Sequence, residues 1–375
     1  MESFRSLFLF NKAVGFGAYT FRLSGSNENG RMVSAWTRSG LTLFAMNLPI
    51  YAYFAYRNVN APYLSSGSAL LDSCFQTMLE VGYVSLPVAS IFRLTKRTLL
   101  ATILSRLRWI DLRISALGIP VDHGYENRVL VLCTVFYLIV VTVASVCALV
   151  LLGNFWSTLM FYGGKIYISY VASVLATNAF VMALVLLRRI WFLEKVLRQD
   201  LGISKFSTVQ ITRPKYPPEM LQTRISTVAQ IYDDLYQLSN KISLLLYVEV
   251  IFYCTIVLIY GILSLFAAYR AVRTGQDEHI ACCGMHTIWW FEYCGIIIAI
   301  LVVCNSLKQA SKDVQSVLGV ALTREGTGMV AVKIRALMLQ IKHNTPRITT
   351  WLFEVDLSMV GTMASFLFMM VQFDS

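Results

Sequence analysis

Charged residues are scarce in this sequence, and their scarcity excludes an ordinary soluble domain. Of its 375 residues, 14% are charged and 57% are hydrophobic, whereas roughly a quarter of the residues in soluble domains are charged. Such a composition is typical of an integral membrane protein. In that setting the net charge of +11 reports which loops face the cytoplasm, and we expect no nucleic-acid partner.

Signals of secretion and of catalysis are also missing. The apolar start is interrupted by Asn11 and Lys12 with no small-residue cleavage site after it, so we expect no cleaved signal peptide. No Asn-x-Ser/Thr sequon occurs, which argues against a glycosylated outer domain. The four histidines do not pair with acids at catalytic spacing, and no P-loop, G-x-S-x-G or H-E-x-x-H pattern is found. We therefore expect neither an enzyme nor a bound cofactor.

The eight cysteines lack the even, tight spacing of a disulfide framework. One cluster, from His279 through Cys282 and Cys283 to His286, lies on a predicted outer loop and has H-x-x-C and C-x-x-H spacings that zinc could use. A disulfide that joins Cys282 or Cys283 to Cys294 is the second interpretation. Free thiols are the third, and we favour them and expect no metal.

Seven apolar runs are long enough for membrane helices, because a hydrocarbon core of ~30 Å needs about 20 helical residues. They cover residues 41–56, 69–92, 129–152, 158–187, 244–267, 288–307 and 350–373.

Lysine and arginine lie almost entirely on one side of these runs. The amino-terminal segment and the loops 93–128, 188–241 and 308–347 carry 28 of them, against 3 on the opposite side. Because short basic loops stay in the cytoplasm, the sequence predicts a cytoplasmic amino terminus and an extracellular carboxyl terminus. This orientation is opposite to that of a G-protein-coupled receptor.

Three amphipathic stretches on the basic side predict helices that extend beyond the membrane. Their apolar stripes recur at helical spacing and consist of Ile103, Leu107, Ile110, Ile114 and Leu117; Leu221, Ile225, Val228, Ile231, Leu235, Leu238 and Ile242; and Val330, Ile334, Leu337 and Ile341. Acids among the polar positions favour a cytosolic bundle over helices that lie on the membrane surface. We predict an all-α membrane protein with seven transmembrane helices and a cytosolic anchor bundle, with breaks near residues 118–120, 213–218 and 324–328.

Ionisable residues inside the predicted spans are candidates for ligand binding, because such residues are costly in hydrocarbon. Glu80 and Lys165 could pair with each other or face a watery cavity. Aromatic walls around a few polar groups suit a small organic ligand, although interfacial belts also place Trp and Tyr at these depths. The predicted pocket residues are Tyr83, Glu80, Lys165, Tyr162, Trp289 and Glu292.

The final apolar run carries a polar ribbon on one helical face, made of Ser358, Thr362, Ser365, Met369 and Gln372. Such a ribbon either packs closely against another helix or lines a water-filled path. Glu354 and Asp356 are costly in hydrocarbon and place the start of this last helix near Leu357. A pore built from it would need several subunits, because no other segment resembles a filter.

The end of this helix resembles the insect gustatory receptor family. That family's last helix carries Thr-Tyr, five apolar residues and Gln-Phe. Here the same positions read Ser365-Phe366, residues 367–371 and Gln372-Phe373. The seven runs, the cytoplasmic amino terminus and the long second cytoplasmic segment extend the likeness over the whole chain. Ser365 keeps the family's hydroxyl, whereas Phe366 lacks that of the tyrosine, which puts a gating hydrogen bond from that ring in doubt.

The resemblance implies a taste receptor that acts as a ligand-gated, non-selective cation channel in the plasma membrane of a sensory neuron. Four copies of this chain, or of related chains, would surround one pore, with permeant cations and membrane lipid as further partners. Gln372 and Phe373 would form the gate, with Ser365, Met369 and Thr362 along the pore. A small organic tastant, of bitter or other contact type, would bind in the outer half of the first six helices.

The alternative is a membrane transporter, for which the Gly163-Gly164 pair would break the fourth span, or a non-channel subunit of a receptor complex. For the channel we predict four regions: a cytoplasmic segment, 1–35; six helices with cytosolic loops and extensions that bind ligand, 36–307; cytosolic amphipathic anchor helices, 308–356; and the pore-lining helix, 357–375.

Overall fold

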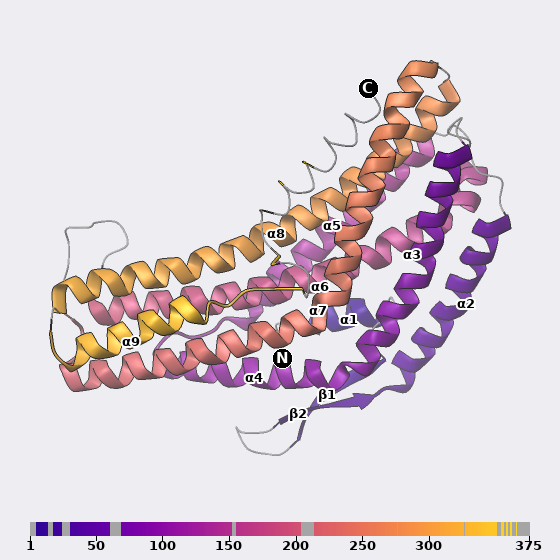
Figure 1. Cartoon of the computed structure of the whole chain (residues 1–375). Helices are drawn as coiled ribbons and strands as arrows, with labels where there is room; N and C mark the ends of the chain where they lie inside the picture. The colour runs from indigo at the N-terminus through magenta and orange to yellow at the C-terminus, as the bar shows by residue number, and fades with distance from the viewer. Residues whose placement is uncertain are drawn as a thin grey trace.

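Three helices far longer than a membrane is thick form the frame of the fold. They are α6 (Phe155–Leu201), α7 (Pro218–Thr274) and α8 (Asp277–Glu325), of 47, 57 and 49 residues. At 1.5 Å per residue they reach roughly 70 to 85 Å, against ~30 Å for a hydrocarbon core. Each helix therefore continues well beyond a bilayer, and Figure 1 shows the three running along the elongated molecule.

The other elements pack around this frame. The computed structural model describes residues 5–13, 18–24, 31–60, 69–151, 155–203, 214–275, 277–325, 327–350, 354–355, 358, 361 and 365. The remaining elements in this part of the chain are α1 (Arg5–Ala13), β1 (Tyr19–Ser24), β2 (Arg31–Trp36), α2 (Arg38–Asn60), α3 (Ala69–Thr95), α4 (Arg97–Ala116), α5 (His123–Leu151) and α9 (Met329–His343).

Within the described residues, four helices are long and apolar enough to cross a membrane. They are α5 and the stretches Tyr162–Leu201 of α6, Pro218–Arg273 of α7 and Ile280–Glu325 of α8, which coincide with most or all of the third to sixth predicted runs. The first two runs lie in α2 and α3, and most of the seventh lies outside the described residues. The protein is thus a helical, multi-pass membrane protein, as the composition predicted.

Helix α5 carries an exposed apolar face that is suited to contact with lipid. Leu132, Phe136, Ile139 and Val143 recur every three or four residues on one face and are largely exposed. A soluble protein rarely exposes so large an apolar patch. In a bilayer the same face is covered by acyl chains.

One end of the molecule is a helix bundle formed by α4, α9, α6 from residue 186, α7 up to residue 243 and α8 from residue 304; we call it the anchor bundle (Figure 1). The predicted apolar stripes of α4, α7 and α9 are buried in it, apart from the half-buried Leu117. These stretches therefore pack against one another. The stripe of α7 is continuous with its span, and α9 adjoins α8 at the predicted break near 324–328, whereas α4 adjoins α3 at Lys96, where no break was predicted.

A buried ion cluster fixes three helices at the base of the anchor bundle. Arg189 of α6 donates to Asp111 of α4 at 2.9 and 3.0 Å, and to Glu126 of α5 at 3.1 Å. Its guanidinium is fully buried, so the two carboxylates supply the charge compensation that such a group needs.

The amino-terminal helix and hairpin were not predicted. Strands β1 and β2 pair antiparallel, with Tyr19 opposite Trp36. The Met32 amide donates to Ser105 of α4 at 2.9 Å, and the Arg97 guanidinium lies 4.0 Å from the Trp36 ring centroid. A two-stranded hairpin is marginal alone, so its contacts with α4 stabilise it. The alternation in residues 19–24 and the Gly/Ser/Asn-rich segment 25–30 are a hairpin signal in the sequence.

Candidate functional site

Lys165 is the centre of a buried cluster where α6, α7 and α8 meet. Its ammonium lies 4.2 Å from the ring centroid of Tyr260, 5.1 Å from that of Trp289 and 5.4 Å from that of Tyr293. Lys165 is only 6% exposed, and desolvated cation–π contacts contribute up to ~2 kcal/mol. The rings thus form an aromatic cage for the cation, which we call the Lys165 cage.

A second layer ties α3 to this cage. The His286 imidazole of α8 stacks on Phe75 of α3 at 3.8 Å with an interplanar angle of 7°, and its Nδ1 is hydrogen-bonded to the Tyr260 hydroxyl. Phe75 also meets Tyr260 edge to face at 5.8 Å. One histidine therefore contacts both α3 and α7 from α8, and movement of any of the three helices must change these contacts.

Glu292 is an acceptor without a partner in this site, where the Trp289 Nε1–H is likewise buried without a hydrogen-bond partner among the described residues. Glu292 is 4% exposed, and neither carboxylate oxygen accepts a hydrogen bond from any described residue. It lies one turn from Trp289 on α8, within electrostatic range of Lys165. A buried polar group without a hydrogen bond costs free energy. A ligand or water bound next to the Lys165 ammonium can therefore donate a hydrogen bond to the Glu292 carboxylate.

The side chain of Tyr83 on α3 packs against the α6 backbone at Gly164, next to Lys165. A Cβ on Gly164 would lie 1.8 Å from the Tyr83 hydroxyl oxygen and 3.0 Å from Cβ of Phe54. Only glycine lets Tyr83 lie against the α6 backbone next to Lys165. Tyr162, one turn earlier on α6, meets Trp289 at 5.7 Å between ring centroids. Five of the six predicted pocket residues thus converge on residues 162–165 of α6.

Comparison with known proteins agrees with this architecture. The model of the family described as 7tm Chemosensory receptor matches residues 4–375. The chain belongs to the 7tm chemosensory receptor family. The fold also resembles the solved structure of the insect olfactory receptor OR5 from Machilis hrabei, with a TM-score of 0.64, 10% identity, and coverage of 98% of this chain and 96% of that one. A comparison with curated proteins gives no significant match.

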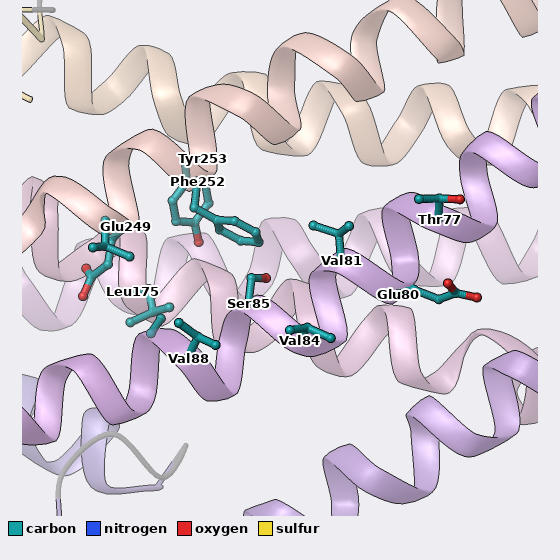
Figure 2. Close-up of a pocket in the computed structure, with 12 residues that line it drawn as sticks. Thr77, Glu80, Val81, Val84, Ser85, Val88, Leu175, Glu249, Phe252 and Tyr253 are labelled. Atoms are coloured by element: carbon teal, nitrogen blue, oxygen red, sulfur yellow. The ribbon is translucent and has the colours of Figure 1, made fainter. Parts of the chain in front are cut away.

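The sixth predicted pocket residue lies elsewhere in this chemosensory receptor. Glu80 lines a cleft between α3 and α7 (Figure 2). Its carboxylate accepts a hydrogen bond from Gln76 Nε2 at 3.1 Å. Among the residues described, Glu80 and Lys165 form no ion pair, so the pairing considered for them is not observed.

Four residues of the receptor's cage and its second layer were not among the predicted pocket residues, namely Tyr260 and Tyr293 of the cage and His286 and Phe75 of the second layer. A partial signal was present in α8, where His286, Trp289 and Tyr293 are spaced by three and four residues and therefore share one helical face. No comparable pattern connects them to Tyr260, whose position depends on how α7 packs.

The cysteine and histidine cluster is not on a loop, because α8 already begins at Asp277. Cys282 and Cys283 are buried, and with Cys294 they are free thiols in the structure. His286 takes part in the stacking described above, and the side chain of His279 lies outside the described residues. The described part of the receptor contains no His, Cys, Asp or Glu group suited to a metal.

Two further predictions concern helix continuity and the pore. Gly163 and Gly164 do not break the fourth span, since α6 is continuous from Phe155 to Leu201. Ser365 is exposed and helical, and its hydroxyl donates to the Gly361 carbonyl at 2.9 Å. The other pore candidates, Thr362, Met369, Gln372 and Phe373, lie outside the described residues.

Proposed function

We propose that this chemosensory receptor is a ligand-gated, non-selective cation channel that detects small organic taste compounds of bitter or other contact type. It acts in the plasma membrane of a sensory neuron, with the cytoplasmic amino terminus that the basic loops predict. The observation that supports this most is the unsatisfied Glu292 beside the Lys165 cage. A structural core would have no reason to keep such a group, because an apolar residue would be more stable there.

The ligand site of this proposal is formed by Lys165, Glu292, Trp289, Tyr162 and Tyr83. Aromatic rings supply the apolar walls, and the ammonium and carboxylate fix the orientation of a small molecule. A ligand that donates to Glu292 satisfies a group that is unpaired in this state. Such a ligand therefore binds more tightly to a rearranged cage than to the present one. This difference in binding free energy can drive gating.

The connection to the pore runs through the segment after α9. The Thr349 amide donates to Ser243 of α7 at 3.1 Å, and Lys308 of α8 pairs with Glu354 at 3.1 Å. Arg347 also pairs with Glu354, at 3.2 Å. We call residues 344–350 and 354–355 the clamped linker. Because α7 and α8 run unbroken from the cage to this linker, a tilt at the ligand site is transmitted to the start of the last helix.

The pore itself requires four subunits, the same chain or related ones, each contributing its last helix. This part rests on the resemblance of the Ser365–Phe373 segment to the gustatory receptor motif. Gln372 and Phe373 form the outer gate, and Ser365, Thr362 and Met369 lie along the pore. A ring of amides can replace the hydration of cations of several kinds.

The proposal is tested by voltage clamp of cells that express this chain, alone or with related subunits, during application of small bitter organic compounds. We expect a ligand-evoked cation current. Gln372→Ala and Phe373→Ala should change block, rectification or leak. Persistent current with both variants identical to the parent would show that the pore assignment is wrong.

A further inference from the structure

Helices α3 and α7 touch at two ends and separate between them. At one end Arg93 Nη2 donates to Glu249 Oε2 at 2.8 Å, and Phe92 meets Tyr247 at 5.5 Å between ring centroids. At the other end Phe75 meets Tyr260. Between these contacts lies a cleft of about 360 Å³, which we call the α3–α7 cleft (Figure 2).

Every polar side chain that lines this cleft already has a hydrogen bond. Thr77 and Ser85 donate to carbonyls of their own helix, at 2.8 and 3.0 Å. Glu80 accepts from Gln76, Glu249 from Arg93, and the Tyr253 hydroxyl donates to the Ala172 carbonyl. These groups keep some capacity for further hydrogen bonds, but apolar side chains make up almost all of the cleft surface. Its walls suit hydrocarbon.

The cleft opens on the outside of the helix bundle. Val81, Val84 and Val88 form its rim, and all three are exposed, Val84 by 66%. In a membrane-spanning receptor this surface faces lipid tails. Behind the rim, Leu175 of α6 and Tyr253 of α7 are 1% and 2% exposed. These two side chains lie at the back of the cleft, beyond the reach of lipid that only covers the outer surface.

The length of the cleft matches one leaflet. Its lining on α3 runs from Thr77 to Ala89, which is ~18 Å at 1.5 Å per residue. Half of a hydrocarbon core is ~15 Å. A compact organic molecule would fill only part of this length, whereas an extended acyl chain follows it throughout.

A cation lies just beyond the end that Arg93 and Glu249 close. The Lys96 ammonium is 5.5 Å from the ring centroid of Phe92, the ring that meets Tyr247 of α7. In the part of the chain described, no carboxylate pairs with Lys96. The proposed orientation places Lys96 at the cytoplasmic leaflet, whose anionic headgroups attract basic residues.

We propose that the α3–α7 cleft binds one acyl chain of a cytoplasmic-leaflet phospholipid, with the lipid phosphate beside Lys96. The bound chain fills the gap between the two helices and holds them apart between their end contacts. This site is separate from the Lys165 cage. It depends on the orientation given above but not on channel activity, so its test stands if no current is found.

The test uses the purified full-length receptor in bilayer nanodiscs that contain an anionic phospholipid with a photoreactive diazirine in the middle of one acyl chain. After illumination, labelled residues are mapped by mass spectrometry. We expect label on Leu175 and Tyr253 at the back of the cleft. Label confined to Val84 and to the exposed face of α5 would show that only bulk lipid is present and would overturn the proposal.

Substitutions in the cleft test whether the labelled lipid chain occupies it. Ser85→Phe fills the cleft and should lower labelling of Leu175 and Tyr253 several-fold, whereas Ile139→Phe on the lipid-facing side of α5 should leave it unchanged. Val84→Trp, which covers the rim from outside, replaces Ser85→Phe if that variant does not fold. Unchanged labelling in the folded variant contradicts the assignment.

Two further experiments test whether the lipid phosphate contacts Lys96 and whether the bound chain belongs to a phospholipid or to a free apolar molecule. Lys96→Gln should reduce labelling by the anionic lipid about fivefold, which corresponds to the ~1 kcal/mol that one basic residue contributes at such a surface. Equal labelling in this variant would remove the phosphate from the proposal. If a diazirine-bearing long-chain alcohol labels Leu175 while the diazirine phospholipid labels only Val84 and α5, the cleft is a site for free apolar molecules, and the lipid assignment is wrong.

Discussion

The Lys165 ammonium lies 4.2 Å from the ring centroid of Tyr260, so a cation on α6 is held by an aromatic residue of α7. The carboxylate that could neutralise this cation, Glu292, remains without a hydrogen-bond donor among the described residues. A buried cation and a buried anion that are close but not bonded form an arrangement that a ligand can complete.

Lys165→Met should reduce the response to an agonist found by screening small organic compounds. The variant keeps an unbranched side chain of similar length but removes the caged charge. Loss of ~2 kcal/mol of desolvated cation–π energy corresponds to an agonist EC50 about thirtyfold higher. Lys165→Arg keeps the charge and is the control. Equal EC50 values for Lys165→Met and the parent, at equal surface expression, would contradict the proposed role.

Glu292→Gln should separate stability from sensitivity. Removing a buried, unpaired charge stabilises the fold, so thermal unfolding of the detergent-purified receptor should occur at the same or a higher temperature. The agonist EC50 should nevertheless rise at least tenfold, because a hydrogen bond to a charged group contributes ~1.5–3 kcal/mol. A lower unfolding temperature combined with unchanged sensitivity would indicate a structural carboxylate and not a ligand-binding one.

Gly164→Ala should destabilise the receptor by about 1–3 kcal/mol through overpacking, because its Cβ would lie 1.8 Å from the Tyr83 hydroxyl oxygen. Gly163→Ala is a matched control, since its Cβ would lie 3.4 Å from Phe54. The unfolding temperatures of the two variants decide the matter. Similar values for both would show that Tyr83 does not depend on the glycine.

Arg93→Gln and Glu249→Gln should each destabilise the fold by about 3–5 kcal/mol, because either change leaves an uncompensated buried charge. Arg93 also donates to Asn11 at 3.2 Å, so Arg93→Gln should in addition loosen α1. The double variant Arg93→Met with Glu249→Met should recover much of the loss. Additive losses in the double variant, measured by thermal unfolding, would mean that the two residues do not act as a pair.

Ser243→Ala should impair gating without impairing binding. It removes the acceptor for the Thr349 amide and so frees the clamped linker from α7. Agonist binding to purified protein should keep its Kd, while the maximal current falls. Ser239→Ala, one turn earlier, removes only a hydrogen bond within α7 and is the control. A Kd that shifts in parallel with the current would place Ser243 in the ligand site.

The sequence predicted the features of the fold that follow from length and periodicity. Six of the seven apolar runs fall on described helices, four of which are long and apolar enough to cross a membrane. The stripe through Ile225, Ile231 and Leu235 predicted a helix that is buried in the anchor bundle. The proline pair at 217–218 correctly marked the start of α7. Each of these is a local property that one helix carries alone.

The features that the sequence did not predict depend on which helices pack against one another. Glu80 and Tyr83 are three residues apart on α3, yet Glu80 lines the cleft and Tyr83 lies against Gly164 of α6. Residues 277–287 were predicted as a loop because they are less apolar, but they contain no proline and α8 begins at Asp277. Tyr260 and Phe75 could not be assigned to the cage from the sequence, because their partners lie on other helices.

The most direct test of the account is single-channel recording from the purified receptor in planar bilayers. We predict agonist-evoked unitary cation currents. Gln372→Ala should alter their conductance without changing the agonist dependence, and Glu292→Gln should alter the agonist dependence without changing the conductance. A folded receptor that binds agonist but never conducts, or a Glu292→Gln variant that changes conductance and leaves agonist dependence intact, would contradict the proposed channel and its ligand site.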